Sequence, residues 1–267
     1  MPDSANYWQK DLSPQNFAAD LSWNFPEQRA KTLTILGGNS QNFSTEVKLA
    51  EFINHNYPFL QEVKNLFPAS LKSKFPPLPN LDFFDATNSG SFKPSPELRA
   101  SLANADFALF SGDFSKNSET AIALAETLKN SPSTPVLLTR DTIDLLSPEA
   151  DAFIERENCA LVASLAQLQK LFRALYYPKM LLLSSPLFPV IETLHKFTLT
   201  YPVALLTFHD GQILAAKNGA VRSVPLAKTT YSPLTLWSGE VAARAAVFSL
   251  FNPSKPLDSL LAALSTK

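Results

Sequence analysis

Cysteine and histidine are scarce in this 267-residue sequence, and their scarcity limits the chemistry that the chain supports. A single cysteine, Cys159, excludes an internal disulfide and a cysteine-rich metal site. The histidines His55, His195 and His209 fall on different predicted elements without metal-ligand spacing, so no zinc site is expected. Cys159 stands in the apolar run Cys-Ala-Leu-Val and is predicted to be a core thiol.

Long apolar runs and an excess of one charge are also lacking. The longest apolar runs, such as residues 180–183 and 203–206, have the length of a strand, so no membrane partner is expected. A formal net charge of -1 with scattered lysines argues against a nucleic-acid partner. The first ten residues lack the pattern of a secretory signal, which predicts a cytoplasmic location.

Glycine is rare as well, with seven residues against 21 prolines and 20 phenylalanines. Each glycine follows an apolar run or lies in a predicted turn, where a positive φ or a close approach of a ligand is useful. We therefore expect at least four of them to mark a site. The seven are Gly37, Gly38, Gly90, Gly112, Gly211, Gly219 and Gly239.

Apolar strand patterns alternate with amphipathic helix patterns through most of the chain, which predicts one α/β domain with a mainly parallel sheet covered on both faces. Residues 1–30 are predicted to be an N-terminal arm with one helix at 13–20, and residues 31–267 the domain. Residues 57–80, rich in Pro, Phe and Lys, are predicted to be a surface connection. Predicted strands cover residues 33–36, 81–86, 105–112, 135–139, 159–163, 179–184 and 202–208, and predicted helices cover 44–53, 97–104, 118–130, 148–157, 165–175, 187–197 and 257–264.

The pattern changes after residue 208. The sequence His-Asp-Gly-Gln at 209–212 is typical of a hairpin turn, and residues 213–216 and 220–225 read as further strands. Antiparallel pairing is therefore predicted at one edge of the sheet.

The stretch from residue 232 to 250 is predicted to be a loop that leads into a buried helix, with Ala242, Ala245 and Ala246 on its packed side. Ser238 is a natural N-cap, Gly239 lets a ligand approach the backbone, and Glu240 stands in the first turn. Unpaired amides and the helix dipole favour a phosphate there, with Glu240 as a base. An acid in a first turn also stabilises a helix without any ligand, and this alternative stays open.

Several loop sequences together resemble the ribokinase-like superfamily, and within it the NAD(P)H-hydrate dehydratases, over roughly residues 31–264. The resemblance implies a three-layer α/β/α sandwich with a mostly parallel sheet and an antiparallel edge. The matching segments are Leu36-Gly-Gly-Asn-Ser, Phe110-Ser-Gly-Asp-Phe, Thr139-Arg-Asp-Thr-Ile, Leu206-Thr-Phe-His-Asp-Gly and Trp237-Ser-Gly-Glu.

The resemblance implies ADP or ATP together with Mg²⁺ as cofactors, and small nucleotide ligands as partners. It implies that Glu240 is the catalytic base, and that Ser238, Gly239, Lys116 and His209 bind the nucleotide or its phosphate. The implied substrate-binding residues are Gly38, Asn39, Ser40, Gly112 and Asp141. Lys116, Arg140 and Lys228 are the nearest basic candidates for neutralising phosphoryl charge. The same residues also fit ordinary roles as turn formers, caps and solvated side chains.

The chain departs from the family at three places. The family's Thr-Pro-His-Pro-Gly-Glu stretch corresponds to Val162-Ala-Ser-Leu-Ala-Gln, which has no imidazole and no carboxylate. Glu240 replaces an aspartate and Trp237 replaces a glycine. A base that is misplaced by about an ångström costs on the order of a hundredfold in rate.

Two functions therefore stand at this point: a nucleotide-dependent hydrate dehydratase, or a catalytically inactive relative that binds nucleotides or serves in assembly. Whether the chain forms a homo-oligomer is left open by the sequence.

Overall fold

The computed structural model describes residues 6–10, 13–76, 80–229, 231–232, 234 and 237–265, apart from the side chain of Lys228. The proposed contribution of that lysine therefore lies outside the described residues.

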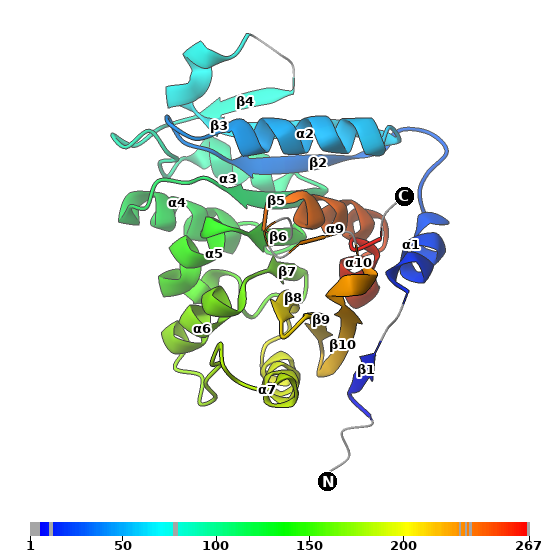
Figure 1. Cartoon of the computed structure of the whole chain (residues 1–267). Helices are drawn as coiled ribbons and strands as arrows, with labels where there is room; N and C mark the ends of the chain where they lie inside the picture. Colours follow the sequence, from blue (N-terminus) through cyan, green and yellow to red (C-terminus); the bar gives the residue numbers. More distant parts are fainter. Residues whose placement is uncertain are drawn as a thin grey trace.

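The described strands form one ten-stranded sheet in the order β1-β10-β9-β8-β7-β6-β5-β2-β3-β4 (Figure 1). All neighbours pair in parallel except β9, which is antiparallel to both β8 and β10. This confirms a mainly parallel sheet with an antiparallel edge region. The strands are β1 Trp8–Lys10, β2 Ala30–Gly37, β3 Leu60–Pro68, β4 Leu81–Phe84, β5 Phe107–Gly112, β6 Val136–Thr139, β7 Cys159–Val162, β8 Ala204–His209, β9 Gln212–Lys217 and β10 Ala220–Pro225.

Helices cover both faces of this sheet, so the molecule has three layers. One face carries α3 (Pro96–Ala103), α4 (Ser118–Lys129), α5 (Asp141–Leu146), α6 (Leu165–Ala174) and α7 (Leu187–Thr200). The other face carries α2 (Ser44–Asn56), α9 (Glu240–Phe251) and α10 (Pro256–Ala262), and α1 (Pro14–Ser22) lies on α10. Short 3-10 turns are found at Ala69–Lys74, Ser147–Ala152 and Leu226–Lys228.

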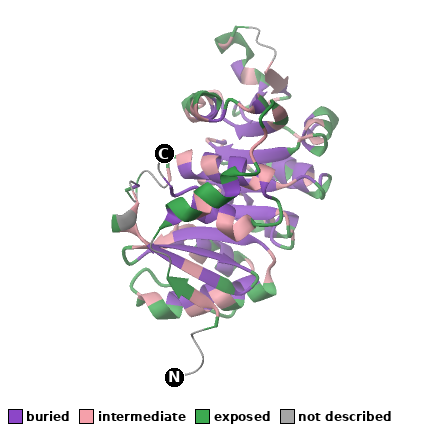
Figure 2. Ribbon diagram, turned by 90° about the vertical axis from the view of Figure 1, so that its right-hand side faces the viewer, coloured by how far each residue is buried: buried purple, intermediate pink, exposed green. Residues whose placement is uncertain are grey.

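The core follows from the alternation of side chains along the strands. In β5, Ala108 and Phe110 face α3 to α7, whereas Phe107 and Leu109 face α2, α9 and α10. All four are buried, and the strands of the sheet are buried along most of their length (Figure 2). The predicted core thiol of Cys159 is confirmed, and burial raises its pKa to about 12.

Two of the predicted segments are wrong. Residues 179–184 form no strand, because β8 occupies the ladder position beside β7 and Pro178 and Pro186 bound the segment. Met180 and Leu183 are exposed there, while Leu181 is buried. Residues 57–80 are not only a surface connection, since they contain the nine-residue strand β3, paired with β2 and β4.

Helix boundaries also differ between 140 and 160. The expected helix at 148–157 is replaced by α5, which begins at Asp141, and by the 3-10 turn Ser147–Ala152. Pro148 lacks a backbone N–H, and Glu149 has non-helical dihedral angles, so a regular helix does not continue through this segment.

The N-terminal arm is part of the packed structure. β1 pairs with β10, and the Trp8 indole Nε1 donates to Ser223 Oγ at 3.1 Å. Leu21 of α1 is buried against Phe248 and Ala262. The boundary at residue 30 between arm and domain stays a prediction. Within the described part of the chain, every helix is too short or too polar to cross a lipid bilayer.

Candidate functional site

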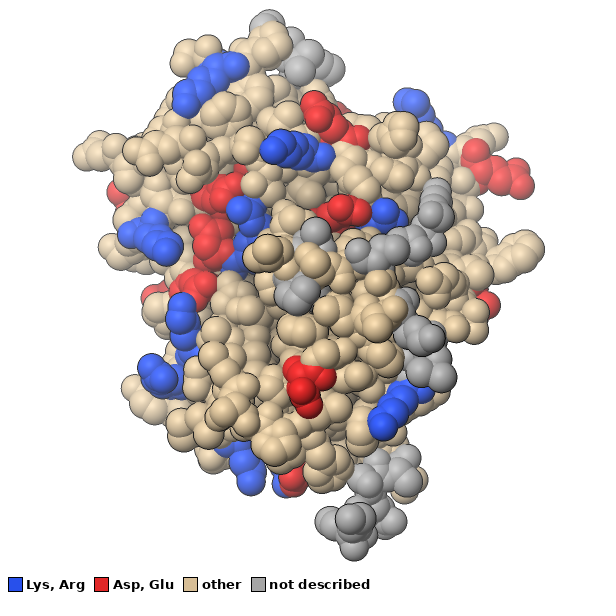
Figure 3. All heavy atoms as spheres, in the orientation of Figure 1, with Lys and Arg blue, Asp and Glu red and all other residues tan. Residues whose placement is uncertain are grey.

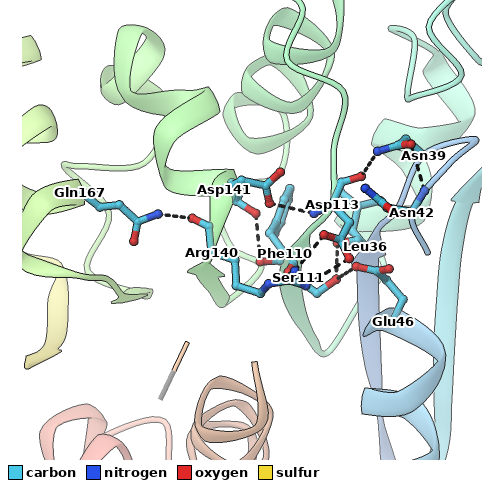
Figure 4. A network of polar contacts seen from close by, with 11 residues as sticks. Leu36, Asn39, Asn42, Glu46, Phe110, Ser111, Asp113, Arg140, Asp141 and Gln167 are labelled. Carbon is cyan, nitrogen blue, oxygen red and sulfur yellow. Dashed lines mark hydrogen bonds and ion pairs between the residues drawn. The ribbon is translucent and has the colours of Figure 1, made fainter. Parts of the chain in front are cut away.

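A polar network joins the carboxyl ends of β5 and β6 (Figure 4). The Arg140 guanidinium makes a two-pronged ion pair with Asp113: Nη2 lies 2.8 Å from Oδ1 and Nη1 lies 3.2 Å from Oδ2. The backbone N–H of Asp113 donates to Asp141 Oδ1 at 2.7 Å. Burial is the main reason that the pKa of Asp141 is raised. Asp141 thus holds the Asp113 loop, and Asp113 orients Arg140.

The loop after β2 is tied into the same network. The Asn39 side chain donates to the Asp113 carbonyl at 2.5 Å and accepts hydrogen bonds from the N–H groups of Gln41 and Asn42. Gly38 N donates to Gly112 O at 3.0 Å. The structure therefore brings together the predicted residues Gly38, Asn39, Gly112 and Asp141. Ser40 instead contacts a different loop, with its N–H donating to Gly90 O at 2.9 Å.

The backbone at these strand ends is strained. Asp113 and Arg140 have backbone φ angles of 58° and 56°, a region that residues other than glycine seldom adopt. Gly112 has φ 97°, and a Cβ atom there would lie 2.2 Å from Asp141 Oδ1, so only glycine fits. Clustered strain of this kind is a feature of ligand-binding and active sites.

Glu46 adds a buried proton to the network. Its side chain enters from α2, and Oε1 lies 2.8 Å from Ser111 Oγ. Ser111 Oγ is also 3.1 Å from the Leu36 carbonyl, which only accepts hydrogen bonds. Ser111 has one hydroxyl hydrogen, so both contacts are hydrogen bonds if Ser111 donates to the Leu36 carbonyl and its oxygen accepts from a protonated Glu46. Burial and the nearby Asp113 carboxylate raise the pKa of Glu46 to about 8, in agreement with that arrangement.

The N-terminal turn of α9 reaches the sheet beside Arg140. Gly239, not Ser238, is the N-cap, so the predicted cap is wrong. Gly239 has φ 100°, and Ser238 precedes it and accepts a long hydrogen bond of 3.5 Å from the Glu240 N–H. The first helical hydrogen bond of α9 runs from Ala243 N–H to Gly239 O at 2.8 Å. The N–H groups of residues 240–242 therefore have no carbonyl partner within the helix. The helix is buried around Ala242, Ala245 and Ala246, as predicted.

Two hollows lie on either side of the segment 237–240. The first, of about 560 Å³, lies at the ends of β7 and β8 and is lined by residues that include Ser164, His209 and Trp237. The second, of about 450 Å³, is lined by α2, Arg140, Ser238 and Glu240. Both volumes lie in the range of small-molecule sites, and both hollows open at the carboxyl edge of the sheet, where α/β proteins bind ligands.

Glu240 lines the second hollow, and its carboxylate is paired with an arginine. Its Oε1 lies 3.4 Å from Nε of Arg244, one helical turn later. Arg244 in turn stacks over the Phe52 ring, with its guanidinium carbon 4.9 Å from the ring centroid. The carboxylate is 38% exposed, so it is accessible to a ligand while paired with Arg244.

Two further predicted residues, His209 and Lys116, line other hollows than Glu240 does. His209 is buried in the first hollow, where its Nε2 lies 2.6 Å from the Ser185 carbonyl and therefore carries the hydrogen. Lys116 lines a separate hollow of about 560 Å³ between α4, α5 and α6. The structure does not bring Lys116 to α9.

Several site residues escaped the sequence analysis, among them Glu46, Lys48, Ser111 and Asp113. Glu46 carried a signal, because it shares the helical spacing of the buried Leu49, Ala50 and Ile53. An acid on the apolar side of a predicted helix is unusual and marks a buried polar contact.

No protein-family profile and no curated protein sequence matches the chain. Several solved structures match the chain in fold. A ribokinase-like superfamily protein from Enterococcus faecalis V583 superposes with a TM-score of 0.64 at 10% identity, over 95% of this chain and 84% of that one. The chain has a ribokinase-like fold.

Two further neighbours carry kinase descriptions, one of them as a candidate only. A UPF0031 family member from Bacillus subtilis, described as a candidate kinase, gives a TM-score of 0.54 at 13% identity and covers 92% of this chain and 84% of its own. Bacillus subtilis pyridoxal kinase in complex with ADP gives 0.51 at 15% identity, covering 88% and 89%. At these identities the likeness establishes the fold, and the activity has to be argued from the site.

Proposed function

We propose that the chain is a nucleotide-dependent enzyme of the phosphoryl-transfer type, with the first turn of α9 as its phosphate-binding element. The observation that carries this proposal is the placement of that turn between two hollows, with Trp237 in one and Ser238 and Glu240 in the other. A nucleotide in the first hollow would direct its terminal phosphate to the N–H groups of the turn, where the helix dipole favours an anion. A second substrate would occupy the other hollow.

In this arrangement Glu240 accepts the proton of a substrate hydroxyl. The hydroxyl oxygen forms a bond to the terminal phosphorus, and the bond from that phosphorus to the bridging oxygen breaks. The nucleotide leaves with the electron pair. Arg140, fixed by Asp113, lies on the same side as Glu240 and supplies positive charge to the transferring group.

Mg²⁺ fits this site as a companion of the nucleotide phosphates. Within the described residues no cluster of three or more His, Cys, Asp or Glu side chains is placed to hold a metal ion. Mg²⁺ binds commonly through one or two carboxylates and the phosphates themselves, and Glu240 is the carboxylate at hand. When bound, Mg²⁺ would neutralise charge on the phosphates.

The specific activity that the sequence resemblance favours is ADP- or ATP-dependent dehydration of hydrated NADH or NADPH. Phosphorylation of the hydrate hydroxyl would be followed by loss of phosphate and of a proton from the neighbouring carbon, which regenerates the double bond. The pyridoxal kinase neighbour was solved with ADP, which supports ADP as the first nucleotide to test.

A second function is favoured by the Glu240–Arg244 ion pair. A glutamate that pairs with an arginine one turn later stabilises its own helix, and this role needs no catalytic activity. Gln167, at the position of a family glutamate, likewise has a structural role, since it completes the capping box of α6 with Ser164. The alternative is therefore an inactive relative that binds nucleotides or serves in assembly.

Substitutions at Glu240 separate the two. For an active enzyme, Glu240→Asp should keep or raise turnover of hydrated NADH with ADP or ATP, because the shorter side chain restores the family geometry, and Glu240→Gln should abolish it. The matched control is Glu97→Gln, which changes an exposed acid in the first turn of α3. Equal background rates in all four proteins would contradict the enzyme proposal.

Thermal melts with millimolar ADP complete the test. Saturable binding should raise the melting temperature of the wild type by mass action. If the wild type shows neither turnover nor a shift, while Trp237→Gly gains the shift, the indole blocks the phosphate position and the enzyme proposal is wrong.

A further inference from the structure

The helix α6 ends in a tyrosine at a position where helices usually have glycine. The N–H of Tyr177 donates to Phe172 O at 2.9 Å, and the N–H of Tyr176 donates to Arg173 O at 3.1 Å. These two hydrogen bonds form a Schellman motif, whose left-handed residue is usually glycine because glycine has no Cβ atom. Tyr176 occupies that position with a backbone φ of 51°, and the residue is 93% exposed. Its ring therefore faces solvent and contributes little to the packing of this protein.

Tyr176 lines a hollow of about 290 Å³ between α6 and the segment that follows it. Phe172 and Tyr177 form its fixed aromatic floor, because their rings lie 4.2 Å and 5.1 Å from the ring of Phe197 on α7. Met180 lines the same hollow and is 72% exposed. Single exposed apolar side chains are ordinary, but exposed apolar side chains that gather around one hollow mark an interaction site.

The charged groups that line this hollow have one sign. Arg173 and Lys179 are both exposed, and neither makes a hydrogen bond or an ion pair within the described residues. The described lining residues include no acid. The pKa of Glu192 on α7 is lowered mainly by its hydrogen bond to Lys196, and less by Lys179, so this acid is engaged elsewhere. Figure 3 shows Lys and Arg side chains in the lower left of the molecule, around the position that α6 has in Figure 1.

We propose that this end of α6 binds an acidic segment of a partner protein. One aromatic or long aliphatic side chain of that segment enters the hollow beside Tyr176 and Met180, and carboxylates on either side of it pair with Arg173 and Lys179. Aromatic residues, Met and Arg are enriched in the cores of protein interfaces, and Tyr and Arg are among the residues that carry most of the binding energy. The positive charge selects an acidic partner over a basic one. This surface does not depend on the proposed function.

Met180 offers a direct readout, because the chain has two methionines, Met1 and Met180. In the full chain with ¹³C-labelled methionine methyl groups, the NMR signal that is absent from Met180→Leu belongs to Met180. The probe is the capped peptide acetyl-Glu-Asp-Phe-Asp-Glu-amide. The Met180 signal should shift and saturate as this peptide is added, and added salt should weaken the binding. The peptide with Lys in place of the acids should cause no shift, and the peptide with Ala in place of Phe should bind on the order of tenfold more weakly.

Tyr176→Gly separates recognition from folding. Glycine suits the left-handed position, so this variant should melt at or above the temperature of the wild type. It should nevertheless bind the acidic peptide on the order of tenfold more weakly. Arg173→Gln and Lys179→Gln should each weaken binding about threefold, as expected for exposed ion pairs. Lys129→Gln is the matched control and should leave binding unchanged, because Lys129 is the cation in the last turn of α4 and lies outside this hollow.

Several results would overturn the inference. If the Met180 signal does not shift with the acidic peptide at millimolar concentration, or shifts equally with the lysine peptide, the surface is not a site for acidic segments. A shift caused only by vesicles that contain phosphatidylserine would make it a lipid-binding surface. A shift that follows protein concentration, together with dimers in sedimentation, would make a second copy of the chain the occupant. Binding by Tyr176→Gly as tight as that of the wild type would show that the exposed ring has no part in recognition.

Discussion

At the scale of single residues, the site is governed by which groups hold protons and which hold charge. Glu46 is fully buried and shares its contact with Ser111, while Asp113 and Arg140 neutralise each other nearby. When Glu46 is neutral, Ser111 can hydrogen-bond to both Glu46 and the Leu36 carbonyl. No second buried anion then lies beside Asp113. The network therefore depends on pH through Glu46, and through Asp141, whose pKa burial also raises.

The pKa of Glu46 is raised from 4.5 to about 8 on folding, so the folded state binds this proton more tightly than the unfolded chain. The stabilisation of the folded state by protonated Glu46 is fully present below about pH 4.5 and is lost as the pH rises toward 8. Glu46→Gln keeps a neutral hydrogen-bonding group and removes this dependence. Its unfolding free energy, measured in urea, should rise relative to that of the wild type between these pH values, by on the order of 5 kcal/mol in all.

The charged groups facing Glu46 are Asp113 and Arg140, and both remain in the variant, as does Asp141. The quantity to compare is therefore the difference between the two proteins at each pH, in which the titration of the other groups cancels. A constant difference across this range would show that Glu46 is ionised in the folded protein.

At the scale of helices and strands, periodicity predicted most of the sheet. Continuous apolar strands such as β5 and β6 were found from sequence because they are buried on both faces. Residues 179–184 show the same composition and yet form a loop, since strand formation needs a neighbouring ladder position as well as apolar side chains. The strand β3 was missed because Lys and Asn interrupt its apolar pattern and the surrounding prolines suggested a connection.

The helix α9 tests the packing that places the site. Ala246 is fully buried in the core that the sheet forms with α2, α9 and α10, so Ala246→Leu should overpack and lower the free energy of unfolding by roughly 1–3 kcal/mol. Ser249→Leu on the half-buried side of the same helix should cost less than about 0.5 kcal/mol. Equal midpoints in chemical denaturation for Ala246→Leu and the wild type would place that face of α9 in solvent.

At the scale of the whole molecule, the glycine positions and the α9 turn indicated from sequence the residues that meet at the carboxyl edge of the sheet, Gly38, Asn39, Gly112 and Asp141 among them. The partners within that edge were not predictable, because Asp113, Arg140 and Glu46 lie far apart in the sequence and meet only through the strand order. The position of Lys116 beside α4, α5 and α6 was not predictable for the same reason, since a loop after β5 reaches either face of the sheet depending on where α4 packs.

The arm and the domain should unfold together. Leu21 of α1 is buried against α9 and α10, so Leu21→Ala should lower the free energy of unfolding by roughly 2–5 kcal/mol and shift one cooperative calorimetric transition. An early separate transition, with the main one unmoved, would show that the arm folds as an independent unit.

In the proposed function, a nucleotide occupies the hollow beside Trp237 and directs its terminal phosphate to the first turn of α9. A crystal structure of the chain with ADP and Mg²⁺ tests it most directly. We expect the terminal phosphate within hydrogen-bonding distance of the N–H groups of residues 240–242, with the rest of the nucleotide toward His209. ADP bound beside Lys116 between α4 and α6, or no ADP at saturating concentration, would contradict the account.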